Sequence, residues 1–127
     1  MSAPTLLVVE DEMLVRMVVV EVLRDAGFNL LEAGDGAEAL EILRDNAVDM
    51  LMTDIQMPRM NGYQLAEAAL ARWPAMKILL VTGYAREVVP ESIANAALQT
   101  LHKPFDVDRL PALITDLLAK GSAASPG

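Results

Sequence analysis

Acidic residues that follow two short apolar runs are the first candidates for chemistry. Glu10, Asp11 and Glu12 come directly after residues 5–9, and Asp54 comes directly after residues 50–53. Carboxylates held side by side repel one another, and a hard divalent cation relieves this repulsion because it prefers oxygen ligands. Mg²⁺ typically takes one or two carboxylates and completes its shell with water and phosphate oxygens. The pattern therefore suggests a Mg²⁺ site.

Two further polar residues follow later apolar runs and complete a set for phosphoryl chemistry. Thr82 follows residues 78–81, and Lys103 comes soon after residues 98–101. A carboxylate can act as a nucleophile toward a phosphoryl group, and the transferred oxygens need donors that stabilise their charge. The Thr82 hydroxyl and the Lys103 ammonium are suitable donors.

The apolar runs predict the strands that would position these side chains. They are continuous rather than alternating, which is typical of strands buried on both faces of a sheet. Four runs are strong, and a fifth run that follows Gly27 is weaker: residues 5–9, 50–53, 78–81, 98–101 and 28–31. The weak strand, which ends near Glu32, is expected at an edge of the sheet.

Helical patterns lie between the runs. The first is a stripe with helical spacing, formed by Val15, Val18, Val19, Val22 and Leu23. A similar stripe covers residues 110–118, and Asp35 and the pair Asn61–Gly62 mark the starts of two more helices. Because Pro90 forbids a helix interior, residues 87–97 are predicted to form a short helix with Pro90 in its first turn.

Strand and helix alternate five times along the chain. This alternation predicts an α/β fold with parallel strands, right-handed crossovers and helices on both faces of the sheet. Such sheets bind ligands at the carboxyl ends of their strands. The candidate polar residues lie at the ends of four predicted strands, so they are expected to converge on one rim.

The composition fits one small domain. The chain has 127 residues, of which 54% are hydrophobic, and its formal charge of -8 would repel nucleic acid rather than attract it. Cys is absent, and no apolar run reaches the roughly 18 residues of a membrane span. We therefore expect a cytoplasmic protein that neither binds nucleic acid directly nor enters a membrane. Residues 120–127 have nothing to bury and are predicted to be a disordered tail or a linker stub after a domain of residues 1–119.

Four motifs, in order, resemble the receiver domain of two-component response regulators. They are residues 7–12 (LVVEDE), 53–62 (TDIQMPRMNG), 80–85 (LVTGYA) and 102–105 (HKPF). The resemblance covers about residues 5–119 and implies a flavodoxin-like (βα)5 fold with strand order 2-1-3-4-5. The chain is similar both to receivers of hybrid histidine kinases and to stand-alone alphaproteobacterial regulators, and its sequence does not distinguish between these two groups.

The resemblance also implies the metal ligands and the phospho-acceptor. Asp54 would accept the phosphoryl group from a phosphohistidine on a histidine kinase or a histidine phosphotransfer protein. Asp11, Asp54 and the backbone carbonyl of Gln56 would bind Mg²⁺, with Glu10 acting through water. The expected function is a switch whose phosphorylation changes its affinity for a partner, and which catalyses its own phosphorylation and dephosphorylation. A phosphorelay intermediate or a phosphate sink in a hybrid kinase system is the alternative.

Further roles carried over from the family concern the donors and the loops. Thr82 and Lys103 would contact the phosphoryl group, and the Lys103–Pro104 bond would be cis. The chain departs from the family pattern at Thr100, where many receivers carry an aromatic residue that reports phosphorylation. Gly83 and Tyr84 follow Thr82, and the glycine permits a more mobile loop. We therefore expect the switch to act mainly through the Gly83–Tyr84 loop and the segment after Pro90, which few core residues tie down.

Three rival interpretations stay open. A Mg²⁺-dependent phosphatase of the haloacid-dehalogenase type also uses an Asp at a strand end, but it needs a second Asp where this chain has Gln56. A flavodoxin-like nucleotide binder would need glycines and hydroxyls in its first loop, whereas this loop has three carboxylates. A degenerate receiver would lack some of the acidic, hydroxyl and lysine groups, which are all present here.

The first predicted helix carries apolar residues beyond one stripe: Met13, Leu14, Met17 and Val20. Because methionine adapts to irregular surfaces, Met13, Leu14 and Met17 are predicted to dock on the helical bundle that carries the donor histidine. The alternative is that the wide stripe reflects only a deeply buried helix.

Overall fold

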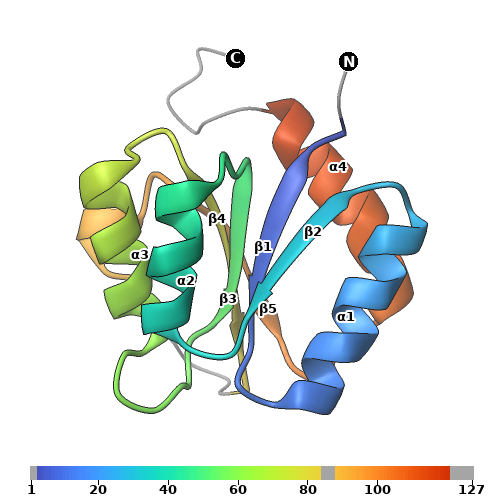
Figure 1. The fold of residues 1–127 in the computed structure, drawn as a ribbon, viewed down its shortest axis with the longest axis horizontal. Coiled ribbons are helices and arrows are strands. Elements are labelled where there is room, and N and C mark those ends of the chain that lie inside the picture. Colours follow the sequence, from blue (N-terminus) through green and yellow to red (C-terminus); the bar gives the residue numbers. More distant parts are fainter. Residues whose placement is uncertain (1–2, 84–87, 121–127) are drawn as a thin grey trace.

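Each continuous apolar run of the sequence forms a strand of one parallel sheet. The computed structural model describes residues 3–83 and 88–120, and its sheet has the order β2-β1-β3-β4-β5 (Figure 1). The strands are β1 (Thr5–Val9), β2 (Asn29–Ala33), β3 (Met50–Asp54), β4 (Lys77–Thr82) and β5 (Ala97–His102). The predicted doubly wound fold and its strand order are confirmed, with the weak strand β2 at an edge.

Alternate residues of the central strands pack on opposite faces of the sheet. In β1, Leu7 and Val9 pack with α2 (Gly36–Asp45) and α3 (Gly62–Arg72), which cover one face. Leu6 and Val8 pack on the other face, with helices α1 (Met13–Asp25) and α4 (Leu110–Lys120). All of these β1 side chains are buried, which explains why the run is continuous rather than alternating.

Side-chain caps fix where two helices begin. The Asp35 carboxylate accepts a hydrogen bond from the Glu38 backbone N–H (2.8 Å) at the start of α2. At the start of α3, Asn61 and Gln64 each accept a hydrogen bond from the other's backbone N–H (both 2.9 Å). Both helices therefore begin where their capping residues predict.

The crossover from β4 to β5 differs from the prediction. Among its described residues, 83 and 88–96, the only helical element is one turn of 3₁₀ helix, η1 (Glu91–Ile93), which is much shorter than the helix predicted for residues 87–97. Pro90 directly precedes the turn and has no N–H to donate. Ile93 is fully buried in the core, and the Ser92 hydroxyl donates to the Glu67 carboxylate of α3 (2.7 Å). The segment is therefore more firmly anchored than expected, whereas Tyr84 lies outside the described residues.

Helix α1 packs with a face that is rotated from the predicted stripe, of which Val19 and Leu23 are buried and Val15 and Val22 half-buried. Val19, Val20 and Leu23 are buried, whereas Val18 is 50% exposed, so placing Val18 in the core and Val20 outside it was wrong. Arg16 lies on the same side of the helix as Val19, Val20 and Leu23. Its guanidinium donates to the Glu10 carbonyl that follows β1, and the row of residues 16, 19, 20 and 23 faces the sheet.

A second 3₁₀ turn, η2 (Val107–Arg109), leads into α4. Within the described part of the chain, no helix combines the length and the apolar character that a bilayer crossing requires.

Candidate functional site

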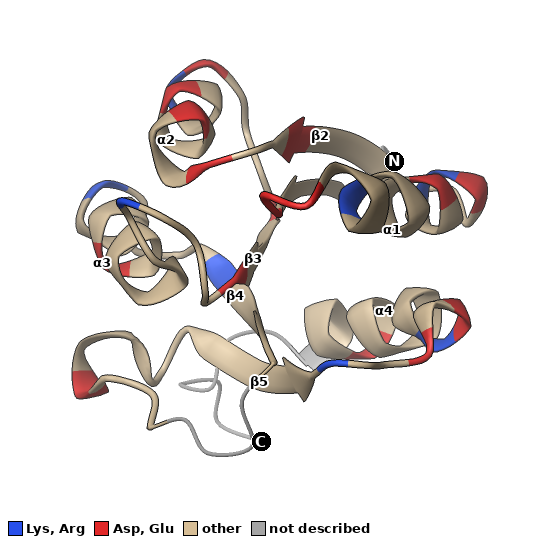
Figure 2. Ribbon diagram, turned by 90° about the horizontal axis from the view of Figure 1, so that it is seen from below, with Lys and Arg blue, Asp and Glu red and all other residues tan. Residues whose placement is uncertain are grey.

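The carboxyl ends of β1, β3, β4 and β5 bring the predicted polar residues together. Glu10 follows β1, Asp54 ends β3 and Thr82 ends β4, and the exposed fractions of these residues are 5%, 4% and 0%. Figure 2 looks onto this edge of the sheet, with the acidic loop between β1 and α1 in red. Buried carboxylates need charged or hydrogen-bonding partners, so the site must supply them.

Lys103 is the main partner of the buried carboxylates. Its ammonium lies 2.9 Å from Glu10 Oε1 and 2.8 Å from Asp54 Oδ2, with Glu12 further away at 3.9 Å. The Lys103 backbone N–H donates to the carbonyl of Thr82 (2.7 Å), which holds the lysine at the end of β4. One cation therefore bridges the ends of β1 and β3.

Burial changes the pKa values of Glu10 and Lys103. It raises the pKa of Glu10 from the ordinary 4.5 to about 7, the charge of Asp54 adds to the rise, and the hydrogen bond from Lys103 opposes it. Burial alone would lower the pKa of Lys103, but hydrogen bonds to Asp54 and Glu10 outweigh that effect and raise it above its usual range. Lys103 is therefore charged. Its single positive charge does not neutralise all of the carboxylates of the pocket.

A divalent cation fits this excess of negative charge. Oxygens of Glu10, Asp11 and Asp54 lie within 4.8 Å of one another, and Asp11 faces solvent. Carboxylate oxygens are the ligands that Mg²⁺ prefers, and Mg²⁺ keeps several waters that an exposed side can supply. The donor set therefore suits Mg²⁺, while the role predicted for the Gln56 carbonyl stays a prediction.

Besides the predicted role of its backbone carbonyl, Gln56 contacts the site through its side chain, which the sequence did not predict. Its backbone N–H donates to Asp54 Oδ1 (3.0 Å), and its side-chain carboxamide contacts the Thr82 hydroxyl and the Gly83 backbone N–H. No local pattern marks this contact, because it joins loops that follow different strands.

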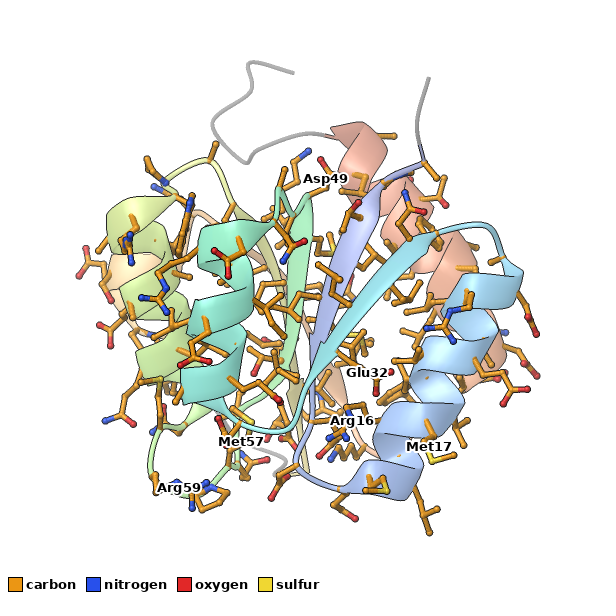
Figure 3. The ribbon with its side chains drawn as sticks, viewed as in Figure 1. Arg16, Met17, Glu32, Asp49, Met57 and Arg59 are labelled. Atoms are coloured by element: carbon orange, nitrogen blue, oxygen red, sulfur yellow. The ribbon has the colours of Figure 1, made fainter. Side chains whose placement is uncertain are left out.

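Arg16 supports the site and was not among the residues that the sequence analysis named. Its Nη1 donates to the backbone carbonyl of Glu10 (2.7 Å), and its Nε donates to Glu32 Oε1 (3.0 Å). Figure 3 labels Arg16 and Glu32 at the lower end of β2 and α1. The guanidinium therefore fixes the loop that carries Glu10 and Asp11. The available signal was a lone cation within an apolar helical run.

A glycine allows the loop after β3 to close against Asp54. The Gly62 backbone N–H donates to the carbonyl of Ile55 (2.9 Å), and a Cβ at Gly62 would meet the Asp54 carbonyl oxygen and lie 2.8 Å from Ile55 Cα. Arg59, earlier in this loop, has a positive φ of 67°. The close approach of α3 to the end of β3 thus requires glycine.

The remaining predicted positions lie around the pocket. The Lys103–Pro104 peptide bond is cis, as the resemblance implied. Thr100 is half-buried in β5, and His102 is exposed. Gly83 has no atom within 4 Å of where a Cβ would lie.

An apolar groove runs beside the acidic pocket. Residues of α1 and of the chain after β5 line it together with polar groups at its end: Glu12, Leu14, Val15, Val18, Val19, Gly83, Lys103, Pro104, Phe105 and Val107. Leu14, Met17 and Met13 are exposed by 76%, 54% and 62%, and Figure 3 shows Met17 on the outer side of α1. Of these three residues, Leu14 lines the groove, and the docking role of Met13, Leu14 and Met17 stays a prediction.

A parallel sheet that gathers three carboxylates, a threonine and a lysine at its carboxyl edge is the arrangement expected of a phospho-accepting receiver. Comparison of the sequence with known families agrees. Residues 6–115 match the family described as response regulator receiver domain. The chain belongs to this family and is a receiver domain of two-component signal transduction.

Known relatives include hybrid kinases and single-domain regulators. The chain is 36% identical over 122 residues to the sensor kinase CckA of Brucella abortus (strain 2308), covering 94% of this chain but only 13% of the kinase. It is 37% identical over 101 residues to the response regulator receiver protein CpdR of the same organism, covering 79% of this chain and 84% of CpdR.

Solved structures support the same assignment. The response regulator protein TrrA of Thermotoga maritima, crystallised in complex with Mg(2+)-BeF, has a TM-score of 0.80 and 30% sequence identity, covering 90% of this chain and 98% of that chain.

Proposed function

We propose that Asp54 is the phospho-acceptor of this receiver, and that Thr82 and Lys103 stabilise the transferred group. The observation that carries the proposal is the buried position of Asp54, whose carboxylate contacts the Lys103 ammonium and lies close to Glu10 and Asp11 at the carboxyl ends of the strands. Donors placed in advance around developing charge stabilise a transition state strongly.

The proposed step moves one phosphoryl group. A carboxylate oxygen of Asp54 forms a bond to phosphorus while the bond from phosphorus to the donor nitrogen breaks, and the imidazole leaves with the electron pair. Lys103 already contacts Asp54 Oδ2, so its ammonium can follow the charge onto the phosphoryl oxygens. Catalysis by the chain consists of positioning these groups.

We propose that Mg²⁺ binds to Asp11, Asp54 and the Gln56 carbonyl, with Glu10 acting through water. When bound, it would neutralise charge on the carboxylates and on the phosphoryl oxygens. Millimolar Mg²⁺ should raise the melting temperature of the wild type by mass action, and Asp11→Asn should remove most of the gain. An unchanged wild-type melting temperature would contradict this metal site.

Beryllofluoride, a mimic of the phosphoryl group, tests the acceptor. With Mg²⁺ present it should bind the wild type and fail to bind Asp54→Ala, because the Asp54 carboxylate supplies the bond to beryllium. Fluorine NMR would report the bound species directly. Equal binding to both proteins would place the acceptor elsewhere.

The partner that we propose is a histidine kinase or a histidine phosphotransfer protein, which docks its helical bundle on Met13, Leu14 and Met17. All three residues are exposed and apolar, and Leu14 lines the groove that leads to Lys103. Met17→Glu should slow phosphotransfer from the cognate donor and leave beryllofluoride binding intact. The matched control is Val88→Glu, which places the same charge on another exposed apolar residue. Equal transfer rates in wild type and Met17→Glu would exclude docking there.

A relay or phosphate-sink role is the second candidate, because a sensor kinase is among the relatives. A relay intermediate would return its phosphoryl group to a histidine partner, whereas a terminal switch would change its affinity for an output protein. The switch is proposed to act through the Gly83–Tyr84 loop, since Thr100 lacks the bulk of an aromatic. Its cytoplasmic location stays a prediction.

A further inference from the structure

The side chain of Gln56 joins the loops that follow β3 and β4. Its Nε2 lies 2.9 Å from Thr82 Oγ1, and its Oε1 lies 3.2 Å from the same hydroxyl oxygen. The Gly83 backbone N–H also donates to Gln56 Oε1, at 3.0 Å. One carboxamide oxygen thus lies within reach of both the Thr82 hydroxyl and the Gly83 N–H, which we call the Thr82–Gly83 donor pair.

Two donors that converge on one oxygen form a small anion-binding corner. The Thr82 hydroxyl is fully buried, so leaving it without a partner would be unfavourable. The other donors near Asp54 are already engaged with its carboxylate: Lys103 contacts Oδ2, and the Gln56 N–H contacts Oδ1. The resting chain therefore satisfies the Thr82–Gly83 donor pair with an amide oxygen of its own.

We propose that the Gln56 carboxamide is a latch that competes with the phosphoryl group for the Thr82–Gly83 donor pair and so lowers the affinity of the resting chain for that group. The inference rests on the proposed role of Asp54 as acceptor. A charged phosphoryl oxygen accepts stronger hydrogen bonds than a neutral amide oxygen, so the exchange can proceed. The hydrogen bonds to Gln56 must break first, and the free energy needed to break them lowers the net affinity for the phosphoryl group.

The opposite role of Gln56 makes a distinct prediction. If the carboxamide instead turned and donated from Nε2 to a phosphoryl oxygen, it would stabilise the phosphorylated state. Removing the carboxamide would then weaken binding of a phosphoryl mimic. If the carboxamide is a latch, its removal strengthens this binding. The sign of the change therefore separates the two roles.

Titration with beryllofluoride in saturating Mg²⁺, followed by fluorine NMR, tests the latch. Gln56→Met keeps most of the side-chain volume and removes the amide, and Gln56→Ala removes both. Each should lower the half-saturating beryllofluoride concentration about threefold to tenfold, as expected for the loss of one or two competing hydrogen bonds. Gln99→Ala, which removes an exposed glutamine from β5, is the matched control and should bind like the wild type.

Amide exchange without the mimic gives an independent measure. In Gln56→Met, the Gly83 N–H loses its acceptor and should exchange with solvent faster than in the wild type. If the wild type binds beryllofluoride while both Gln56 variants bind it equally or more weakly, the latch is wrong and the proposed acceptor stands. If the wild type does not bind at all, the acceptor proposal and the latch both fail.

Discussion

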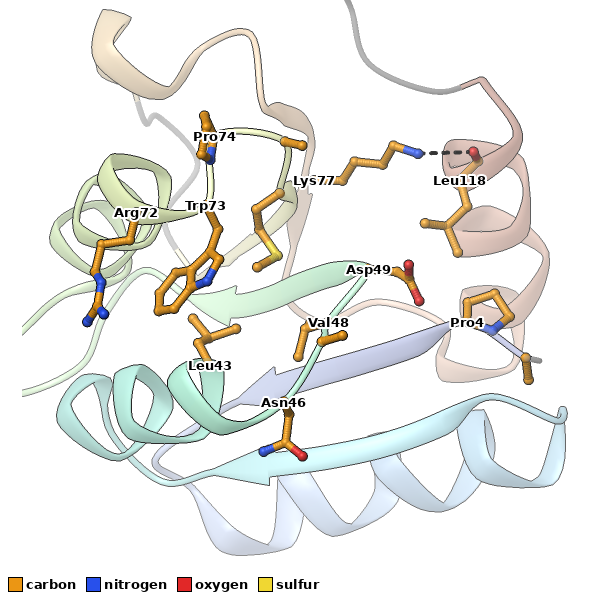
Figure 4. Close-up of a pocket in the computed structure, with 14 residues that line it drawn as sticks. Pro4, Leu43, Asn46, Val48, Asp49, Arg72, Trp73, Pro74, Lys77 and Leu118 are labelled. Carbon is orange, nitrogen blue, oxygen red and sulfur yellow. Dashed lines mark hydrogen bonds between the residues drawn. The ribbon is translucent and has the colours of Figure 1, made fainter. Parts of the chain in front are cut away.

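The two ends of the sheet each have a pocket, and the larger one lies away from the converging charges. At the amino ends of the strands, a pocket of about 830 Å³ is lined by residues that include Pro4, Trp73, Lys77 and Leu118 (Figure 4). The groove beside Lys103 at the carboxyl ends measures about 700 Å³. Pocket volume alone would therefore select the amino end of the sheet, which lacks the converging charges.

The polar contacts at the two ends differ in kind. At the amino end, Lys77 Nζ donates to the carbonyl of Leu118 (3.3 Å), and the Thr5 N–H donates to the Asp49 carboxylate (2.8 Å). Each contact pairs one charged side chain with one backbone group of a distant segment. Among the described residues, the buried polar side chains lie at the carboxyl ends of strands: Glu10, Thr53, Asp54 and Thr82. Convergence of buried charge, rather than pocket volume, therefore marks the functional end.

Removing one lysine from each end should show the largest contrast. In chelator, Lys103→Met leaves Glu10 and Asp54 without their shared cation and should lower the free energy of unfolding by about 3 kcal/mol. Lys77→Met removes one partly buried hydrogen bond and should lower it by about 1 kcal/mol or less. Urea denaturation measures both. Equal losses would mean that the two ends do not differ energetically.

Glycine substitutions should sharpen the comparison with a smaller effect. Gly62→Ala forces a Cβ against the backbone of Asp54 and Ile55 and should cost about 2 kcal/mol. Gly27, at the amino end of β2, has open space around it but a φ of 102°, so Gly27→Ala should cost about 1 kcal/mol. Only Gly62→Ala should also weaken beryllofluoride binding. If Gly27→Ala weakens it equally, the effect is global rather than local.

The pH dependence of stability should reveal the buried carboxylate. In the unfolded chain Glu10 releases its proton near its ordinary pKa of 4.5, whereas the folded chain retains it until about 7. The contribution of Glu10 to stability is therefore fully present below 4.5 and is lost as the pH rises through about 7. In chelator, denaturation midpoints should fall over this window, and Glu10→Gln should flatten the fall. An unchanged slope in Glu10→Gln would assign the titration to another group.

The central strands and the acceptor could be predicted from the chain alone, for identifiable reasons. Strands β1, β3 and β4 are buried on both faces, so their residues form continuous apolar runs, and parallel pairing places Asp54 and Thr82 at one edge. The chemistry of Asp54 and Lys103 was apparent once four motifs were considered together.

Other features depend on contacts between distant segments. The sheet-facing side of α1 includes Arg16, whose partners are Glu10 after β1 and Glu32 in β2, and apolar periodicity alone placed Val18 and Val20 wrongly. The carboxamide of Gln56 reaches across 26 positions in sequence to Thr82. The Gln56 contact leaves no local pattern in the sequence, and the only local sign of the Arg16 contacts is a lone cation within an apolar helical run.

Locating the phosphoryl group would test the central claim most directly. The wild type is incubated with Mg²⁺ and a small acyl phosphate, and intact-protein and peptide mass spectrometry then count and place the modification. We predict one phosphoryl group on the wild type, in the peptide that contains Asp54, and none on Asp54→Ala. A phosphoryl group that persists on Asp54→Ala, or that maps to another peptide of the wild type, would contradict the assignment of Asp54 as the acceptor.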